Sequence, residues 1–226
     1  MSEAEATQSR PRLEARRRAF LDAGSAVFLD KGYANATLDD VIARSGGSRQ
    51  TLYALFGGKQ GLFEAIVAER SKAIFVPFAN QHLLDQDPEE VLLDLGIHYL
   101  ETVTSPDVLG LYRLVVGECA AMREVAQRFW DTGPGRSRAL LAEYFKQLSE
   151  RGVLHLSDPE RASHQFWGLL LGSFQLRCLL GVSAAPEAAE IRDFVSTAVA
   201  RFLDGCRTRP ATPASPSATE APRSAG

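Results

Sequence analysis

Residues 37–59 read TLDDVIARSGGSRQTLYALFGGK, and this stretch decides the fold. Thr37 and Asp40 have the spacing of a capping box, in which the Thr hydroxyl accepts from the N3 amide and the Asp carboxylate accepts from the Thr amide. A helix therefore begins after Thr37 and continues until Gly46–Gly47 supplies a tight turn. Ser48 then caps a second short helix. The stretch predicts two short helices joined by a glycine turn.

The second of these helices has an apolar face and a polar face. Leu52, Leu55 and Phe56 share one face, as core residues do. The other face carries hydrogen-bond donors concentrated at the helix N-terminus: Arg49, Gln50, Thr51 and Tyr53. A helix pair with a glycine turn and a polar second helix is the geometry that places the second helix in the DNA major groove. Since Arg pairs with guanine and Gln with adenine, Arg49 and Gln50 are the candidates for base reading.

Other polar side chains around the second helix suit the DNA backbone. The hydroxyls of Thr51 and Tyr53 fit phosphates, and Lys59 stands at the start of the next helix, where its charge adds to free amides. Each residue also has a structural explanation. Capping alone accounts for Thr37 and Ser48, packing could account for Tyr53, and Lys59 could simply be solvated. Their joint spacing favours DNA binding over these separate explanations.

The helical pattern extends along the rest of the chain. Apolar residues recur at intervals of three and four, as at Leu62, Ile66 and Val67. No sustained alternation of Val, Ile and Thr is present, so the predicted fold class is all-α. Glycine and proline breakers divide the chain into helices expected at 11–31, 37–44, 48–55, 59–80, 88–104, 107–120, 122–132, 135–151, 158–182 and 187–206.

Composition and charge indicate the domain organisation. Residues 10–59 carry nine Lys and Arg against five Asp and Glu, although the whole chain has a net charge of -3, so a basic head precedes an acidic body. We expect a three-helix DNA-binding domain over 10–67 and a larger helical domain for effector binding and dimerisation over 68–207, with the junction inside the fourth helix. The ends, 1–9 and 208–226, have too few large apolar residues to bury and are expected to be disordered.

A set of positions in the head forms one specific pattern: Phe28, Gly32, Tyr33, Thr37, Asp40, Val41, Gly46, Ser48, Thr51, Leu52, Tyr53, Phe56, Lys59, Leu62 and Phe63. This pattern covers roughly residues 11–67 and closely resembles the N-terminal signature of the TetR/AcrR family of bacterial transcriptional regulators. The resemblance implies a homodimeric, all-helical, ligand-responsive DNA-binding protein, usually a repressor, with a variable C-terminal domain. It also implies phosphate contacts from one group of residues, Thr37, Thr51, Tyr53 and Lys59, while Arg49 and Gln50 face the groove.

The chain departs from the family pattern at two places. Gly47 stands in the turn where the family commonly has Val, and Ala54-Leu55 stands where an aromatic-His pair often follows the Tyr. The second departure removes possible backbone contacts, so we expect affinity to depend more on Arg49 and on the N-terminal arginines. That group, which a solvated helix face explains equally well, consists of Arg10, Arg12, Arg16, Arg17 and Arg18.

The body is expected to supply a dimer surface, because one short helix gives little specificity unless two copies lie about 34–36 Å apart on DNA. The candidate interface combines two glycines that allow close helix approach with an apolar stripe: Gly168, Gly172, Phe194, Val195, Ala198 and Phe202. Packing within one subunit is the alternative for these residues. The candidate pocket residues are His98, Tyr99, Tyr112, Arg113, Trp130, Phe166 and Trp167, although aromatic residues at helical spacing usually belong to a core. The sequence does not identify the effector.

The sequence argues against several other classes of protein. The three cysteines are odd in number and far apart, which argues against a disulfide scaffold or zinc site and fits a reducing cytoplasm. No nucleophile motif, phosphate-binding loop or metal-ligand spacing of histidines is present, so no enzyme activity, cofactor or metal is expected. The apolar stretch 166–182 is interrupted by Gln175 and Arg177 and predicts a buried helix rather than a membrane span.

The sequence therefore predicts a cytoplasmic, ligand-responsive regulator, a repressor, that binds a palindromic double-stranded DNA operator as a homodimer and is released by a small molecule. An enzyme is one alternative. A helical protein-interaction module without sequence-specific DNA binding is another, and it leaves the polar N-terminus of the second short helix unexplained.

Overall fold

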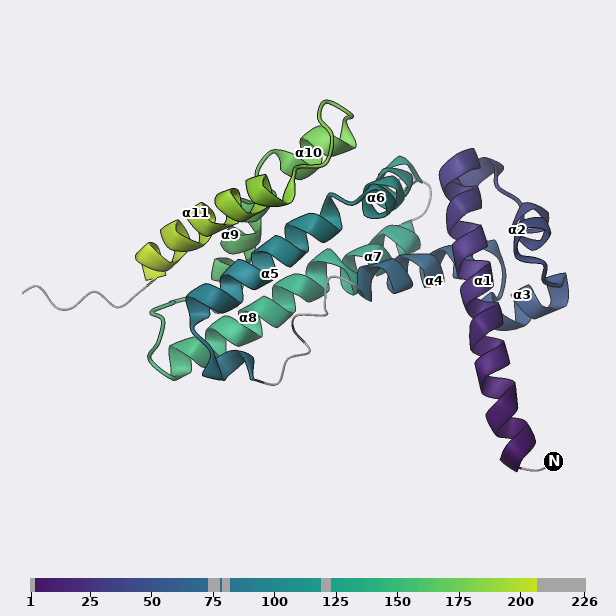
Figure 1. Cartoon of the computed structure of the whole chain (residues 1–226), viewed down its shortest axis with the longest axis horizontal. Helices are drawn as coiled ribbons and strands as arrows, with labels where there is room; N and C mark the ends of the chain where they lie inside the picture. Colours follow the sequence, from purple (N-terminus) through teal and green to yellow (C-terminus); the bar gives the residue numbers. More distant parts are fainter. Residues whose placement is uncertain (1–2, 73–77, 79–81, 119–122, 207–226) are drawn as a thin grey trace, which may run out of the picture.

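The described part of the chain has an all-α fold, with a smaller group of helices at one end and a larger group at the other (Figure 1). The computed structural model describes residues 3–72, 78, 82–118 and 123–206, and no strand occurs among them. The head consists of α1 (Glu3–Asn35), α2 (Leu38–Ser45) and α3 (Arg49–Phe56), followed by the connecting helix α4 (Lys59–Ser71). The body contains the 3-10 helix η3 (Leu83–Asp85), α5 (Pro88–Val103), α6 (Pro106–Glu118), α7 (Arg123–Thr132), α8 (Pro134–Glu150), α9 (Pro159–Leu171), α10 (Phe174–Leu179) and α11 (Ala188–Cys206). The predicted all-α class is confirmed.

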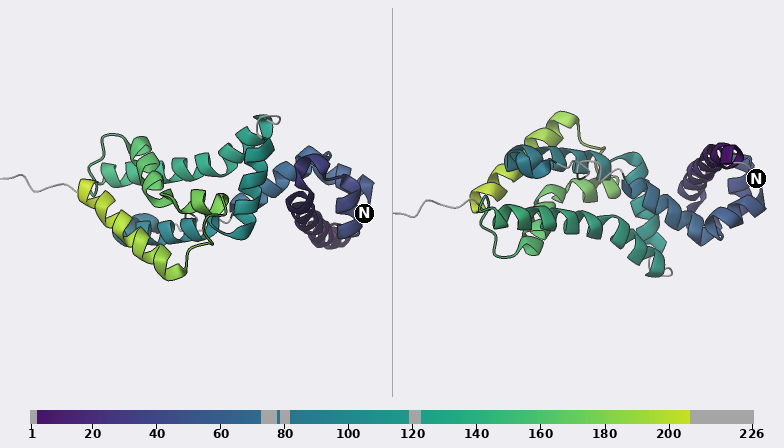
Figure 2. Two further views of the ribbon diagram at one scale, coloured as in Figure 1. Left: turned by 90° about the horizontal axis from the view of Figure 1, so that it is seen from above. Right: turned by 90° about the horizontal axis from the view of Figure 1, so that it is seen from below.

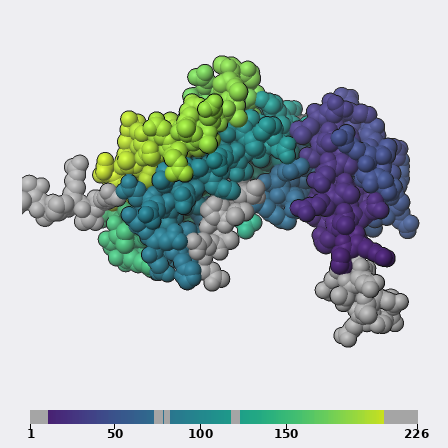
Figure 3. Space-filling view, viewed as in Figure 1, coloured from purple at the N-terminus to yellow at the C-terminus, as the bar shows by residue number. Residues whose placement is uncertain are grey.

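The molecule is elongated, with the head at one end. Both views of Figure 2 show α4 leaving the head and entering the body, and Figure 3 shows the head as a lobe beside the larger body. Within the body, α11 packs on α5 and α9, while α8 packs on α9. None of the described helices combines the length and the apolar character that crossing a bilayer requires.

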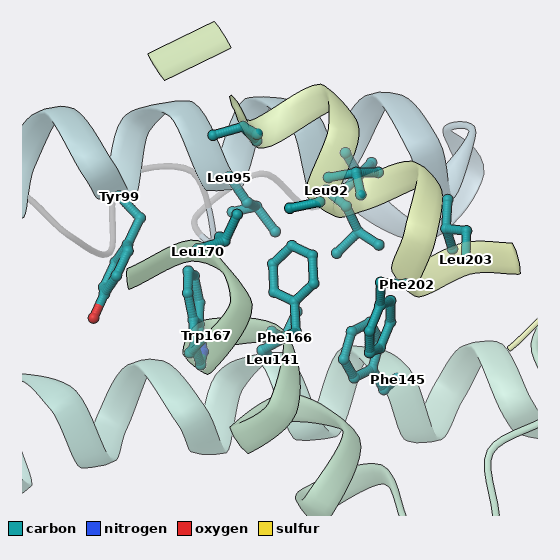
Figure 4. Packing of buried hydrophobic residues seen from close by; sticks show 14 of the residues in the cluster. Leu92, Leu95, Tyr99, Leu141, Phe145, Phe166, Trp167, Leu170, Phe202 and Leu203 are labelled. Carbon is teal, nitrogen blue, oxygen red and sulfur yellow. The ribbon is translucent and has the colours of Figure 1, made fainter. Parts of the chain in front are cut away.

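The core of the body joins α5, α8, α9 and α11 (Figure 4). The rings of Phe145 and Phe202 stack with their centroids 5.2 Å apart, and Phe166 meets Phe202 edge-on at the same distance. Burial of each such side chain contributes about 1.5–3 kcal/mol to the stability of the fold. Because its side chains are closely packed, this cluster makes the centre of the body rigid.

The core of the head is not confined to the head. It is built around Phe20, Phe28 and Phe63, but Leu111 and Val115 of α6 are buried in the same cluster, together with Val125 of α7. The predicted boundary at residue 67 therefore lies within a continuous apolar core. Because α6 and α7 belong to both regions, a shift of either helix acts directly on the packing of the head.

The helix α1 extends beyond its predicted span, 11–31, at both ends. The helix α1 begins at Glu3 rather than at residue 11, so residues 3–9, predicted as disordered, are helical; the Glu, Ala and Gln residues among them are good helix formers, and extending a helix is less costly than starting one. Its regular geometry is interrupted at Gly32, with φ 76° and ψ 162°, where the predicted helix stops. Part of the predicted fourth helix and the predicted tail, 73–77, 79–81 and 208–226, lie outside the described residues.

The prediction of one helix over 158–182 is wrong. Gly172 has φ 44° and ψ -128°, which ends α9 at Leu171, and α10 begins only at Phe174. A side chain at Gly172 would be strained by this backbone and would lie 3.3 Å from the Phe194 ring. The predicted pair Gly168 and Gly172 therefore does not form a small-residue ridge on a continuous helix.

Candidate nucleic-acid interface and pocket

The start of α2 is fixed by the predicted capping box. The Asp40 amide donates to Thr37 Oγ1 over 3.2 Å, and the Thr37 amide donates to Asp40 Oδ2 over 3.1 Å. Lys31 Nζ donates to the other carboxylate oxygen of Asp40 over 2.8 Å. The hydrogen bond from Lys31, followed by those from Thr37, lowers the pKa of Asp40 to about 2. The cap thus also ties α2 to the end of α1.

Ser48 and Thr51 organise the N-terminus of α3. The Ser48 hydroxyl accepts from the Thr51 amide over 3.1 Å, and the two hydroxyls are joined by a hydrogen bond of 2.8 Å. Gly46 and Gly57, both with φ near +70°, end α2 and α3. The short helices therefore have the boundaries that the turn residues predicted.

Gly47 has a packing role that explains one departure from the family pattern. A Cβ at this position would lie 2.2 Å from Cζ of Phe20. Phe20 is 0% exposed and lies at the centre of the head core, so its ring has no space to retreat. The turn comes close to α1 because residue 47 has no side chain.

The outer face of α3 presents polar groups to solvent. Tyr53 is 49% exposed, and Gln50 is exposed with no hydrogen bond from its amide to any described residue. Arg49 is also exposed, but its Nη2 lies 2.5 and 2.6 Å from the two carboxylate oxygens of Asp39 on α2. An exposed ion pair of this kind adds about 0–1 kcal/mol, so another partner can displace Asp39. Nothing in the local sequence indicated this contact.

Lys59 contacts the end of α1. Its Nζ donates to the Ala34 carbonyl over 3.2 Å and lies 4.5 Å from the centre of the Tyr33 ring. A cation is favourable at a helix C-terminus, because carbonyl groups there lack helical partners. Lys59 therefore holds α4 against α1, and a phosphate contact would add to this role.

Two of the N-terminal arginines also have internal partners. Arg16 Nη1 donates to the carbonyls of Ser45 and Gly46 over 3.3 and 3.1 Å, which fixes the turn before α3. Arg17 forms an ion pair of 3.7 Å with Glu69. The basic face of α1 thus serves partly to hold the head together.

Two family models match the chain. Residues 20–66 match the bacterial regulatory proteins of the tetR family, and residues 90–205 match the C-terminal domain of AefR-like transcriptional repressors. The chain belongs to the TetR family of transcriptional regulators. Members of the TetR family regulate transcription and are not enzymes.

Individual relatives agree with the family. The HTH-type transcriptional regulator YvkB of Bacillus subtilis is 26% identical over 165 residues, which are 71% of this chain and 82% of YvkB. A TetR-family regulator from Mesorhizobium loti has the same fold, with a TM-score of 0.77 and 24% identity over 87% of this chain and 99% of its own. The flavonoid-responsive regulator FrrA has a TM-score of 0.72 and 25% identity, covering 86% of this chain and 98% of FrrA.

This TetR-family body contains an apolar pocket of about 230 Å³, which is lined by residues of every α-helix from α4 to α10. Tyr99, Tyr112 and Trp130, three of the predicted pocket residues, line it. So do Arg70 and Arg138, which no sequence motif indicated. The aromatic residues were candidates because of their type, whereas nothing in the sequence separates Arg138 from other arginines on the same helix.

The other four predicted pocket residues lie elsewhere. His98 lines a separate polar cleft of about 890 Å³ between α1, α4, α5 and α6. Arg113 instead donates to the carbonyls of Leu179 and Cys178, 2.9 and 2.7 Å away, at the end of α10. Phe166 and Trp167 are buried in the core of the body. Their apolar helix faces point at neighbouring helices rather than at a cavity.

Arg70 lies between the pocket and the head. It lines both the apolar pocket and the polar cleft. Its Nη1 lies 3.2 Å from Oδ2 of Asp107 on α6, and its Nη2 lies 3.9 Å from Oδ1 of Asp22 on α1. Through these two ion pairs, the guanidinium of Arg70 links α4 to α6 in the body and to α1 in the head.

The predicted dimer residues divide into two groups. Val195 is 0% exposed, and Ala198 and Phe202 are also buried in the subunit's own core, because this face of α11 packs on α5 and α9. Phe194 is half-buried and meets Phe174 edge-on. Thus the apolar stripe is used for packing within the subunit, which was the alternative. Gly168 and Gly172 are exposed, and the neighbouring segment of the chain also exposes Leu169, Leu176, Leu180 and Val182.

Proposed function

We propose that this protein is a transcriptional repressor that binds a palindromic operator as a homodimer and releases it when a small molecule binds the body. The observation that carries the proposal is the outer face of α3. A short, capped helix with exposed Arg49, Gln50 and Tyr53 follows a glycine turn at the tip of the molecule, in a chain of the TetR family.

In the proposed complex, α3 lies in the major groove. Arg49 and Gln50 read base edges, and Arg49 exchanges the Asp39 carboxylate for the O6 and N7 atoms of guanine. Backbone contacts from Thr37, Ser48, Thr51, Tyr53 and Lys59 set the register without reading sequence.

The dimer surface in this proposal is the exposed apolar side of α9 and α10. Leu169 is 44% exposed next to the exposed Gly168 in the chain, and Leu176 and Leu180 are 58% and 69% exposed. We infer that these residues form one apolar area, since contiguous exposed apolar residues mark interaction surfaces. A second copy covers this area and brings two α3 helices to the spacing of one turn of DNA.

The proposed effector site is the apolar pocket, since it touches α4, which connects the body to the head. A ligand that prefers a shifted position of α4 would displace the reading helices, with a coupling of about 1–3 kcal/mol in a typical case. The flavonoid-responsive character of FrrA supports a small organic effector for a body of this shape.

The experiment that tests this function is the selection of bound duplexes from a random DNA library by the purified full-length protein, followed by sequencing. A palindromic motif is the expected result, and the affinity should fall with salt at a log-log slope near -0.9 per phosphate contacted. If the folded, dimeric protein enriches no motif with or without a ligand panel, the helical interaction module becomes the better description.

A further inference from the structure

The walls of the apolar pocket are aromatic. Tyr112 and Phe129 meet edge-on with their ring centres 5.6 Å apart, and Trp130 and Tyr99 complete the lining that the rings of a ligand would contact. The volume of about 230 Å³ is below the roughly 300–1,000 Å³ that is typical of drug-sized ligands. The pocket therefore suits a small planar molecule of one or two rings.

The charged groups in the pocket are all positive. Arg70 and Arg138 line it, and none of the described lining residues is Asp or Glu. Arg70 already faces two carboxylates, those of Asp107 and Asp22. Arg138 is half-buried and has no carboxylate partner among the described residues: its Nη1 donates to the Pro134 carbonyl over 2.9 Å, and its Cζ lies 5.1 Å from the centre of the Trp130 ring. A half-buried guanidinium without a counterion favours an anionic partner.

A second polar group in the lining also lacks a partner. Tyr99 is 4% exposed, and its hydroxyl makes no hydrogen bond to any described residue. Figure 4 shows the ring at the edge of the body core, with the hydroxyl pointing away from the labelled apolar side chains. Burial raises the pKa of Tyr99 to about 12 while the charge of Arg138 acts in the opposite direction, so the hydroxyl stays protonated as a donor close to Arg138. Since Tyr99 lines the pocket and its hydroxyl donates to no described residue, the hydroxyl is available to donate to a ligand oxygen.

We propose that the pocket binds a planar aromatic anion, an aromatic carboxylate or a phenolate, with its charged oxygen between the guanidinium of Arg138 and the hydroxyl of Tyr99. Its rings lie against Tyr112, Phe129 and Trp130. The proposal that the anion binds is argued from the pocket residues alone. The effect of the anion on DNA binding rests on the function proposed above.

Binding is tested by calorimetry on the full-length protein with four probes of matched size. These are 2-naphthoate, its neutral amide, the cation 2-naphthylmethylammonium and the aliphatic anion decanoate. Naphthoate is expected to bind at least tenfold more tightly than each of the others, because only it supplies both the rings and the anionic oxygen. Equal or tighter binding of the amide or the cation overturns the anion assignment, and tighter binding of decanoate overturns the aromatic one. No binding of naphthoate overturns both.

Two variants test the named contacts. Arg138→Gln removes the charge, and Tyr99→Phe removes only the hydroxyl; each should weaken naphthoate binding about tenfold, as expected for a hydrogen bond to a charged group, and leave the amide within about twofold. Arg136→Gln, a charge change on the same helix outside the pocket lining, should leave naphthoate binding unchanged. If Arg138→Gln weakens both ligands equally while the variant stays folded by circular dichroism, the guanidinium only shapes the pocket and the assignment fails.

The same samples separate this proposal from the proposed function. Operator binding without any naphthoate binding leaves the repressor proposal intact and overturns the ligand class. Naphthoate binding that depends on Arg138, in a protein that enriches no DNA motif, supports the ligand class and overturns the repressor. When both hold, naphthoate should lower operator affinity by at least fivefold in the wild type and have no effect at the same concentration in Arg138→Gln.

Discussion

At the scale of single residues, the proposed reading face of α3 has an internal partner, Asp39, which DNA would have to replace in the proposed complex. Asp39 keeps the guanidinium of Arg49 in place in the free protein, and Gln50 beside it makes no comparable contact among the described residues. An arginine with its orientation fixed loses less entropy on binding a base than a freely rotating one.

Replacing Arg49 by Ala should cost roughly 1–3 kcal/mol on the selected operator and relax one base position in each half-site, because a bidentate contact to guanine is lost. Binding measured on the operator and on a set of single-base variants checks this. Arg44→Ala is the matched control, since it removes one exposed charge from α2. Equal losses across all DNA sequences for Arg49→Ala would show that Arg49 contacts only phosphate.

The close approach at Gly47 leads to a stability prediction. Gly47→Ala should destabilise the protein by about 1–3 kcal/mol, since the added methyl group overlaps the buried ring of Phe20. Urea unfolding measures the change, and the double variant with Phe20→Leu should cost less than the sum of the two single changes. Gly117→Ala, where no neighbour lies within 4 Å, is the control for adding a methyl group. Additive costs in the double variant would rule out the clash.

At the scale of helices, short-range signals were predictable and long-range contacts were not. The capping box at Thr37, the cap at Ser48 and the glycine turn follow from residues within four positions of one another, and all are present. The contact of Lys59 with Ala34 and the pairing of Arg49 with Asp39 join residues 25 and 10 positions apart, for which the sequence gives no spacing rule. The pocket was predicted by residue type for Tyr99, Tyr112 and Trp130 only, because apolar periodicity does not distinguish a cavity wall from a packed core.

The start of α2 should show a pH-dependent stability. The pKa of Asp40 is about 2 in the folded protein against 3.8 as its ordinary value, so its ionised form stabilises the fold above about pH 4, and this contribution disappears as the pH falls toward 2. Asp40→Asn should therefore lower the melting temperature at pH 6, with a difference from wild type that shrinks between pH 4 and pH 2.5. A difference that is constant over this range would mean that the charge of Asp40 has no role in the cap.

The helix α4 is expected to transmit ligand binding through Arg70. Asp107→Asn removes an exposed ion-pair partner, so stability should change by less than about 1 kcal/mol. The ratio of operator affinities without and with effector should fall several-fold, because α4 and α6 are no longer linked at this point. Asp94→Asn, an exposed charge on α5, is the control. An unchanged ratio in Asp107→Asn would place the coupling elsewhere.

At the scale of the whole molecule, the head, the pocket and the exposed apolar side of α9 and α10 occupy separate regions of an elongated shape. Substitutions can therefore be chosen that change the side chains of one region without changing those of the others. Substitutions far from the proposed DNA surface are then informative about assembly, because any effect on operator binding must come through the dimer or through the helices that contact the head, α4, α6 and α7.

Leu169→Arg should convert the dimer into a monomer, since it places a charge within the proposed apolar surface. Sedimentation velocity should show a single species of about 24.6 kDa, and binding to a palindrome should weaken toward that of one half-site. Val153→Arg, a similarly exposed apolar residue between α8 and α9, should remain dimeric. A dimeric Leu169→Arg variant would move the interface to another surface.

The burial of Leu111, Val115 and Val125 in the core of the head bears on how such regulators can be recombined. A chimera joined after residue 67 would graft a foreign DNA-reading head onto α6 and α7 side chains that had not been selected to fit it. The exchangeable unit is therefore discontinuous along the chain: the head together with the faces of α6 and α7 that contact it. Hybrids that carry over these faces should retain the operator of one parent and the effector of the other, whereas hybrids cut only at the connecting helix should fold poorly.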